Sequence, residues 1–325
     1  MEDAAISLGG KPGAALHIST LFPASAEPRD SDSLSDTLVV FLNGLMLPRA
    51  TWLDAIHHLI RLRTEAREPI PALLSYDRFG QGTSDPDPSD PPDTPYGHDV
   101  TAVVADLHQL LVQVARDRLH KPLETLRIVL VCNSIGCAIA RLYTTAHPGS
   151  VAALLFLDPM MANSDFVSLI PDPASPTFDP ARLPASISVA DLQHSRTMAA
   201  QFFHPTVPNG ERFDRRTLAQ HLPWADKPPF PPAPSGRPPH LTILGHDWDT
   251  FADNCETGPM SLPKPVVNAY LNPAWQKYNE GLTGLVGDGD AELKIARGCG
   301  HFIQRDDPVV VATETAALLK SLSAE

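Results

Sequence analysis

The chain has 325 residues, of which 43% are hydrophobic and 19% charged, and its formal net charge is −13. This length is enough for one substantial hydrophobic core. Its acidity argues against binding to nucleic acid, which needs clustered Lys and Arg, and against an anionic membrane surface. The start carries no secretory pattern and the densest apolar run, 151–157, is too short to span a bilayer, so a cytoplasmic protein is expected.

The cysteines are widely spread along the chain. No two of them form a CxxC pair, so the sequence favours free thiols over a zinc site or a disulfide framework. No motif points to a metal or an organic cofactor, and none is expected. The four positions are Cys132, Cys137, Cys255 and Cys299.

Continuous apolar runs and amphipathic segments alternate along the first half of the chain. Apolar runs without a polar break are typical of strands buried on both faces of a sheet. Helical spacing places Trp52, Ile56 and Ile60 four residues apart. The alternation predicts an α/β fold with a parallel sheet and helices on both faces. Strands are predicted at 37–44, 71–77, 126–132 and 151–157, and helices at 49–63, 98–119 and 135–146.

A proline-rich region then interrupts this alternation. Residues 171–239 hold 15 of the chain's 34 prolines. The stretch 226–239 has no regular structure in this interpretation, because proline fixes φ and removes a backbone donor. Helices fit only at 188–203 and 211–222. We therefore interpret 160–239 as a lid or cap inserted over the sheet.

The alternation resumes after the insertion. Residues 1–159 and 240–325 are therefore predicted to form one core. The later elements are a strand at 240–245, a helix at 272–286, a strand at 291–296 and a last helix from about residue 308.

A serine stands at a junction of strand, turn and helix. In the sequence VLVCNSIGC, residues 129–137, a buried strand leads to Ser134 and a helix follows. Such a nucleophile elbow exposes the serine hydroxyl above the sheet and needs small flanking residues. Gly136 fits the usual GxSxG pattern, whereas Cys132 replaces its first glycine. The alternative is a serine that only caps the helix.

A histidine follows the last predicted strand. His301 stands in the sequence GCGHFI, before the last predicted helix. This order along the chain, serine first and histidine last, is the order in which one hydrolase fold supplies its nucleophile and its base. A third turn, FLNGL, ends in Leu45, whose N–H could join that of Ile135 in an oxyanion hole. By itself this third signal is weak, since an ordinary turn looks the same.

These segments together resemble the α/β-hydrolase superfamily. The stretches NGLMLPRATW, SYDRFGQGTSD, VLVCNSIGCAIARLY and GCGHFIQRDDP occur in the order typical of that family, over residues 37–160 and 240–320. The resemblance implies an eight-stranded, mostly parallel sheet and a Ser-His-acid triad. Asn43 replaces the usual histidine before the glycine of the oxyanion loop. A serine at 134, in place of an aspartate, argues against the dehalogenase and epoxide-hydrolase branches.

The triad acid has two candidate positions. Asp158 ends the strand AALLFLD, and Asp247 and Asp249 follow the strand HLTILG. Most members of the superfamily place the acid after the later strand, three residues past a glycine, where this chain has Trp248. The closing segments resemble a subgroup that keeps the acid after the earlier strand. Asp158 is therefore the predicted acid, and the other two are expected to cap the next turn.

The predicted activity is cleavage of an ester or lactone of a medium-sized apolar small molecule through an acyl-enzyme on Ser134. A thioesterase, an amidase and a carbon–carbon hydrolase are alternatives, because the triad does not separate them. A ligand-binding protein of the same fold is the alternative outside enzymes. The substrate and the oligomeric state are not predicted. Large apolar side chains of the lid are expected to line a substrate pocket or to form the lid's own core: Met160, Met161, Phe166, Phe178, Phe202, Phe203, Trp224 and Phe230.

Overall fold

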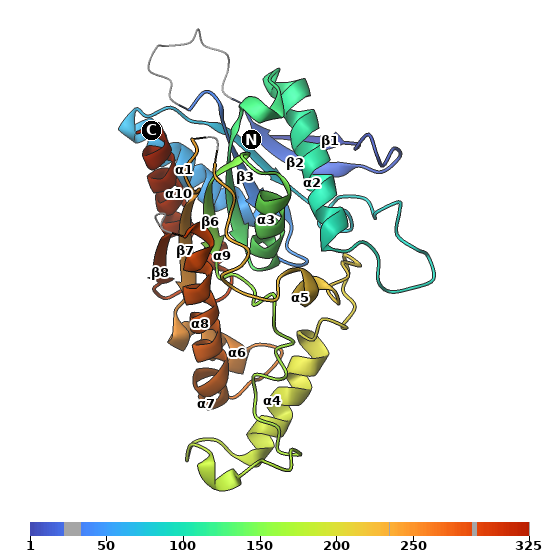
Figure 1. Ribbon diagram of the computed structural model, residues 1–325, viewed down its shortest axis with the longest axis vertical. Coiled ribbons are helices and arrows are strands. Elements are labelled where there is room, and N and C mark those ends of the chain that lie inside the picture. The colour runs from blue at the N-terminus through green and yellow to red at the C-terminus, as the bar shows by residue number, and fades with distance from the viewer. Residues whose placement is uncertain (23–33, 234, 288–290, 325) are drawn as a thin grey trace.

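The computed structural model describes residues 1–22, 34–233, 235–287 and 291–324. Its centre is an eight-stranded sheet with the strand order β1-β2-β4-β3-β5-β6-β7-β8 (Figure 1). The pairs β1–β2 and β2–β4 are antiparallel, and every later pair is parallel. The prediction of a mostly parallel eight-stranded sheet is confirmed. The strands are β1 (Glu2–Ile6), β2 (Leu16–Leu21), β3 (Thr37–Leu42), β4 (Ala72–Tyr76), β5 (Arg127–Asn133), β6 (Val151–Leu157), β7 (His240–His246) and β8 (Ala291–Ala296).

Helices cover both faces of this sheet. α1 and α10 pack against each other on one face, and α2 packs against α3 on the other (Figure 1). Within the described part of the chain, no helix has both the length and the hydrophobicity that crossing a membrane requires. The α-helices are α1 (Leu53–Ala66), α2 (Val100–Val114), α3 (Ile135–Ala146), α4 (Val189–Phe202), α5 (Leu218–His221), α6 (Trp248–Thr257), α7 (Lys264–Val266), α8 (Asn272–Leu282), α9 (Ile303–Asp306) and α10 (Pro308–Ser323). Shorter 3-10 or π turns are η1 (Arg49–Trp52), η2 (Ala115–Leu119), η3 (Leu123–Thr125), η4 (Pro180–Arg182), η5 (Val267–Leu271) and η6 (Thr283–Val286).

The central strands are apolar along their whole length because both of their sides are buried. In β3, Val39 and Phe41 face the core that α1 and α10 complete, whereas Leu38, Val40 and Leu42 face the core beneath α2 and α3. A strand covered on both sides loses the alternation of apolar and polar residues. This explains why continuous apolar runs predicted the strands correctly.

Most predicted elements are present within two residues of their expected bounds, and β6 and α3 coincide with them. The helix expected at 211–222 is wrong in extent, because only the short α5 forms there. The prediction did not include β1, β2 or α6. The burial of β1 is partial, so that strand lacks the apolar run by which the others were found.

The segment 160–239 contains α4 and α5 and extends beyond one end of the sheet (Figure 1). α4 begins at a capping box, in which the Ser188 hydroxyl and the Asp191 carboxylate bond each other's backbone N–H groups. Its buried apolar side chains join the core beneath α2 and α3. The division into a core and a lid stays a prediction. Parts of both predicted regions, at 23–33, 234, 288–290 and 325, lie outside the described residues.

Candidate active site

The carboxyl ends of the parallel strands meet at one edge of the sheet, where an open α/β fold builds its site. Ser134 stands there between β5 and α3, with φ 56° and ψ −121°. A residue other than glycine adopts this backbone conformation only under strain, which the surrounding structure must offset. A Cβ atom on Gly136 would lie 2.5 Å from the carbonyl oxygen of Leu42. The crowding expected at a nucleophile elbow is therefore present, and the fully buried Cys132 fits where the pattern usually has glycine.

Three side chains form one hydrogen-bonded chain at this edge. The Nε2 atom of His301 lies 3.0 Å from the Ser134 Oγ, and its Nδ1 atom lies 2.5 Å from an oxygen of Asp158. Asp158 is completely buried, whereas 21% of the His301 side chain is exposed. A carboxylate accepts hydrogen bonds only, so Nδ1 carries the proton and Nε2 is free to accept the serine proton. This is the geometry that activates a serine nucleophile.

Asp158 follows β6 directly and is held in place by β7. Its N–H donates to the carbonyl of Leu244 at 2.7 Å. Burial alone would raise the pKa of the Asp158 carboxyl, but the two histidines that bond it, His246 and His301, outweigh that effect and hold the pKa below its usual value. The carboxyl is therefore ionised across the physiological range, as the partner of a catalytic imidazole must be.

The other two acid candidates lie elsewhere. The carboxylate of Asp247 accepts hydrogen bonds from the N–H groups of Asp249 and Thr250, and so caps α6. The Asp249 side chain is 83% exposed and lies 3.4 Å from the Lys264 ammonium. The structure thus brings only Asp158, of the three candidates, into hydrogen-bond distance of His301.

Asn133 connects the elbow to the histidine loop. Its side-chain amide donates to the carbonyls of Leu157 and His301, at 3.0 Å each. On the other side of the loop, the N–H of Gly300 donates to the Asp306 carboxylate at 2.8 Å. Sequence reasoning did not identify Asn133 as functional, because the pattern around the serine leaves that position open.

The predicted oxyanion donors lie on either side of Ser134. Ile135 is the first residue of α3, where a backbone N–H has no acceptor within the helix. The loop after β3 comes close to the nucleophile, since a Cβ atom on Gly44 would lie 3.4 Å from the Ser134 Cβ. Leu45 follows that contact directly. Both residues are therefore at the elbow, and their role as an oxyanion hole stays a proposal.

Buried polar side chains hold this loop from behind. The Arg78 guanidinium donates to the carbonyls of Asn43 and Gly44, at 2.7 and 3.0 Å. Glu211, from the inserted segment, accepts from Arg78 at 2.9 Å and from the N–H of Met46. Asn43, the substitute for the usual histidine, accepts from the Trp52 indole at 2.6 Å. Glu211 was missed because 133 residues separate it from Arg78 and no local pattern marks it.

Replacement of Glu211 by Leu is expected to lower the free energy of unfolding by about 3–5 kcal/mol, because it leaves the Arg78 guanidinium buried without its partner. Urea unfolding measures this loss. Glu211→Gln is the matched control, since it keeps the side-chain shape and one of the two acceptor oxygens, and it should lose less. A Leu variant as stable as the wild type would show that the buried pair does not hold the loop.

Away from Ser134 and His301, one cluster among the residues that the structure describes has the composition of a metal site. Ligand atoms of Asp87, Asp90 and His98 lie within 4.8 Å of one another. The Lys11 ammonium lies 2.5 Å from Asp87, and the Arg212 guanidinium lies 3.9 Å from Asp90. These cations already compensate the acidic groups, so the cluster is a network of ion pairs.

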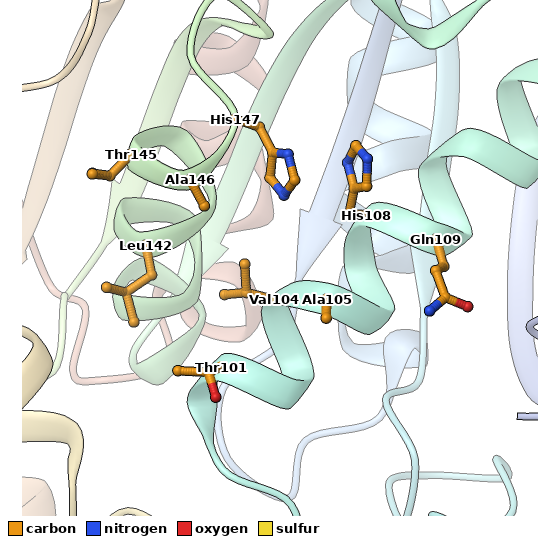
Figure 2. A pocket seen from close by; sticks show the side chains of 9 residues that line it. All are labelled: Thr101, Val104, Ala105, His108, Gln109, Leu142, Thr145, Ala146 and His147. Carbon is orange, nitrogen blue, oxygen red and sulfur yellow. The ribbon is translucent and has the colours of Figure 1, made fainter. Parts of the chain in front are cut away.

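A cleft of about 540 Å³ lies between α2 and α3 (Figure 2). His108 and His147 stack across it with their ring centroids 3.8 Å apart. Burial, together with the neighbouring His108, lowers the pKa of His147. The residues of α3 that line the cleft lie in the C-terminal half of that helix, whereas Ser134 precedes its first turn. We therefore do not place the substrate in this cleft.

Aromatic side chains extend from the histidine into the inserted segment. The Trp275 ring meets His301 edge-on, with the centroids 5.5 Å apart, and its indole N–H donates to the carbonyl of Pro159 at 2.8 Å. Phe166 lies 5.7 Å from Trp275 and 5.2 Å from Phe203, measured between ring centroids. Of the large apolar side chains noted in the insertion, Met161, Phe166 and Phe230 are buried, Met160, Phe178 and Phe203 are partly buried, and Phe202 and Trp224 are exposed.

Fold and site together define a class of protein: an open α/β sheet with a serine, a histidine and an aspartate at one edge in a single hydrogen-bonded chain. The chain belongs to the alpha/beta hydrolase family, whose sequence model matches residues 39–314. Among curated proteins, none matches the chain by sequence.

Solved structures with a similar fold come from several organisms. Alpha/beta hydrolase domain-containing protein 10 from mouse is 13% identical, with a TM-score of 0.55 over 99% of this chain and 100% of that one. The esterase Est1E from Butyrivibrio proteoclasticus, solved with ferulic acid, is 14% identical, with a TM-score of 0.54 over 99% and 100%. Epoxide hydrolase VrEH1 from Vigna radiata is 13% identical, with a TM-score of 0.51 over 98% of both chains. At these identities the similarity shows the fold alone.

Proposed function

We propose that the protein is a serine hydrolase that cleaves an ester or lactone of a medium-sized apolar small molecule. The observation that carries the proposal is the chain of hydrogen bonds from the Ser134 hydroxyl through His301 to the buried Asp158. Each member supplies what acyl transfer needs: a nucleophile, a base with a free Nε2 atom, and an acid that fixes the tautomer. A nucleophilic serine also favours ester cleavage over epoxide opening, although an epoxide hydrolase is among the similar structures.

In the proposed mechanism, His301 takes the Ser134 proton as the oxygen attacks the substrate carbonyl. The N–H groups of Leu45 and Ile135 hold the oxyanion, and the alcohol leaves with the proton from His301. A water then gives a proton to the same histidine as its oxygen attacks the acyl carbonyl. The bond to Ser134 breaks, the serine oxygen takes the proton back from His301, and the acid is released. This chemistry uses side chains and backbone alone, so the proposal involves no metal and no organic cofactor.

Reaction with a fluorophosphonate followed by turnover of p-nitrophenyl esters and of lactones tests the proposal. We expect stoichiometric labelling of Ser134 and faster cleavage of apolar acyl groups than of charged ones. Activity should rise with pH in one step, because only a neutral His301 can accept the serine proton. A folded protein that neither reacts with the probe nor cleaves any member of an ester, lactone and thioester panel would instead be a ligand-binding protein.

The inserted segment 160–239 is proposed to select the substrate. Phe166 links this segment to His301 through Trp275. Phe166→Leu is expected to raise KM for bulky acyl esters by about tenfold, the scale of one altered hydrophobic contact, and to leave labelling by a small probe unchanged. Phe202→Leu is the matched control, because Phe202 is 46% exposed. Equal losses with large and small substrates would contradict a role in selection.

A further inference from the structure

A second histidine bonds the triad acid from the side opposite His301. His246 is the last residue of β7 and only 2% of its surface is exposed. Its Nδ1 atom lies 2.8 Å from Oδ1 of Asp158, while Oδ2 of the same carboxylate faces His301. The backbone N–H of His246 donates to that Oδ1 atom as well, at 3.3 Å. One buried carboxylate therefore lies between two imidazole rings.

The hydrogen bonds of His246 fix its protonation. Its Nε2 atom lies 3.0 Å from the side-chain oxygen of Asn272. The Asn272 amide nitrogen is occupied by the carbonyl of Trp248, at 3.2 Å, and a carbonyl can only accept. The amide oxygen must then face His246, so Nε2 donates. Nδ1 donates too, because its partner is a carboxylate, and a ring that donates from both nitrogens is an imidazolium.

The surroundings of this ring favour the charged form. Burial by itself would lower the pKa of His246, but Asp158 and Asn272 outweigh burial and raise it. Asp158 and, further away, Asp247 at the start of α6 are the acidic groups that act on this ring, and His301 binds the other oxygen of Asp158. Phe251 stacks on the ring with the centroids 4.1 Å apart, and Trp275 meets it edge-on. Burial raises the pKa of the nearby thiols, Cys137 and Cys255, and so keeps them neutral.

We propose that His246 is a positioning residue. As a permanent imidazolium it holds Asp158 in place, and it thereby sets the pH at which His301 becomes an active base. The proposal rests on the proposed serine hydrolase function. In the resting site the positive charge of His246 balances the negative charge of Asp158. A proton on His301 then adds a second cation to the same carboxylate, which Coulomb repulsion disfavours. His301 is therefore kept neutral, and ready to accept the serine proton, at lower pH than Asp158 alone would allow.

His246→Asn tests the effect on the reaction, because its amide nitrogen can replace the Nδ1 donor without the charge. The measurement is the rate of Ser134 labelling by a fluorophosphonate as a function of pH. We expect the acid limb to move to higher pH by about one unit, the scale of one neighbouring unit charge. The matched control is His240→Asn, at the other end of β7, which should leave the limb in place. A limb that coincides with that of the wild type, or lies at lower pH, overturns the proposal.

The charge itself is measured on the wild-type chain, so this arm does not depend on the folding of a variant. Long-range proton–nitrogen correlation spectra of protein with ¹⁵N-labelled histidine distinguish protonated from free ring nitrogens. The His246 signals are assigned through their contacts with the Phe251 ring. Two protonated nitrogens at pH 7 support the proposal, and one free nitrogen overturns it. If Ser134 does not react with the probe at any pH, the serine hydrolase proposal fails, while the spectrum still decides the state of His246.

Discussion

Ser134→Ala is expected to abolish ester hydrolysis and fluorophosphonate labelling, with a loss on the order of 10³–10⁶-fold in kcat. The change removes the only oxygen that His301 Nε2 contacts in the hydrogen-bonded chain, at 3.0 Å, and takes almost no volume from the core. The backbone at this position stays strained with either residue, so the fold should persist. Steady-state kinetics on the preferred ester and mass spectrometry of the labelled protein measure the two losses.

A second serine provides the matched control for this prediction. Ser195 is completely buried in α4 within the inserted segment, far along the chain from the elbow. Ser195→Ala makes the same chemical change and is expected to keep both activity and labelling. If Ser134→Ala retained more than a tenth of the wild-type kcat on every ester that the wild type cleaves, the serine mechanism would be wrong.

Local patterns were sufficient to predict the parallel part of the fold. Strands such as β5 and β6 are buried on both sides and so appear as unbroken apolar runs, and the helix after Ser134 begins where the pattern changes. The same elements fix Ser134 and Asp158 at strand ends, so the sequence also placed both residues at one edge of the sheet. β1 was not predicted because it is a partly exposed edge strand, and β2 was not predicted because polar residues interrupt its sequence, LHISTL.

Contacts between distant segments were not predictable in this way. His246 and Asn272 contact each other across 26 residues, and Glu211 meets Arg78 across 133, with no fixed spacing that would reveal either pair. Each depends on how loops and helices pack at the edge of the sheet, which is a property of the tertiary fold. The sequence therefore contains the proposed nucleophile and base as motifs, whereas the side chains that contact the proposed acid and the oxyanion loop become evident only in three dimensions.

The same limit applied to the choice of acid, which the residues alone left between two strand ends. The unusual Trp248 argued for the earlier strand, and the geometry agrees with that choice, because Asp158 lies 2.5 Å from His301 while Asp247 caps α6. Asp158 also has a second partner, His246, and this contact decides how an asparagine at position 158 would be oriented.

Asp158→Asn is expected to keep the fold and to lower kcat by about 10⁴-fold. Two N–H donors of His246 point at Oδ1, so the asparagine must keep its oxygen there and turn its amide nitrogen toward His301. That nitrogen donates, which forces the proton of His301 from Nδ1 to Nε2, and a protonated Nε2 cannot accept from Ser134. Asp247→Asn is the control and should be much milder, since an asparagine also caps a helix. If Asp158→Asn stayed active while Asp247→Asn lowered kcat as much as His301→Gln, the catalytic acid would be the one that follows the later strand, β7.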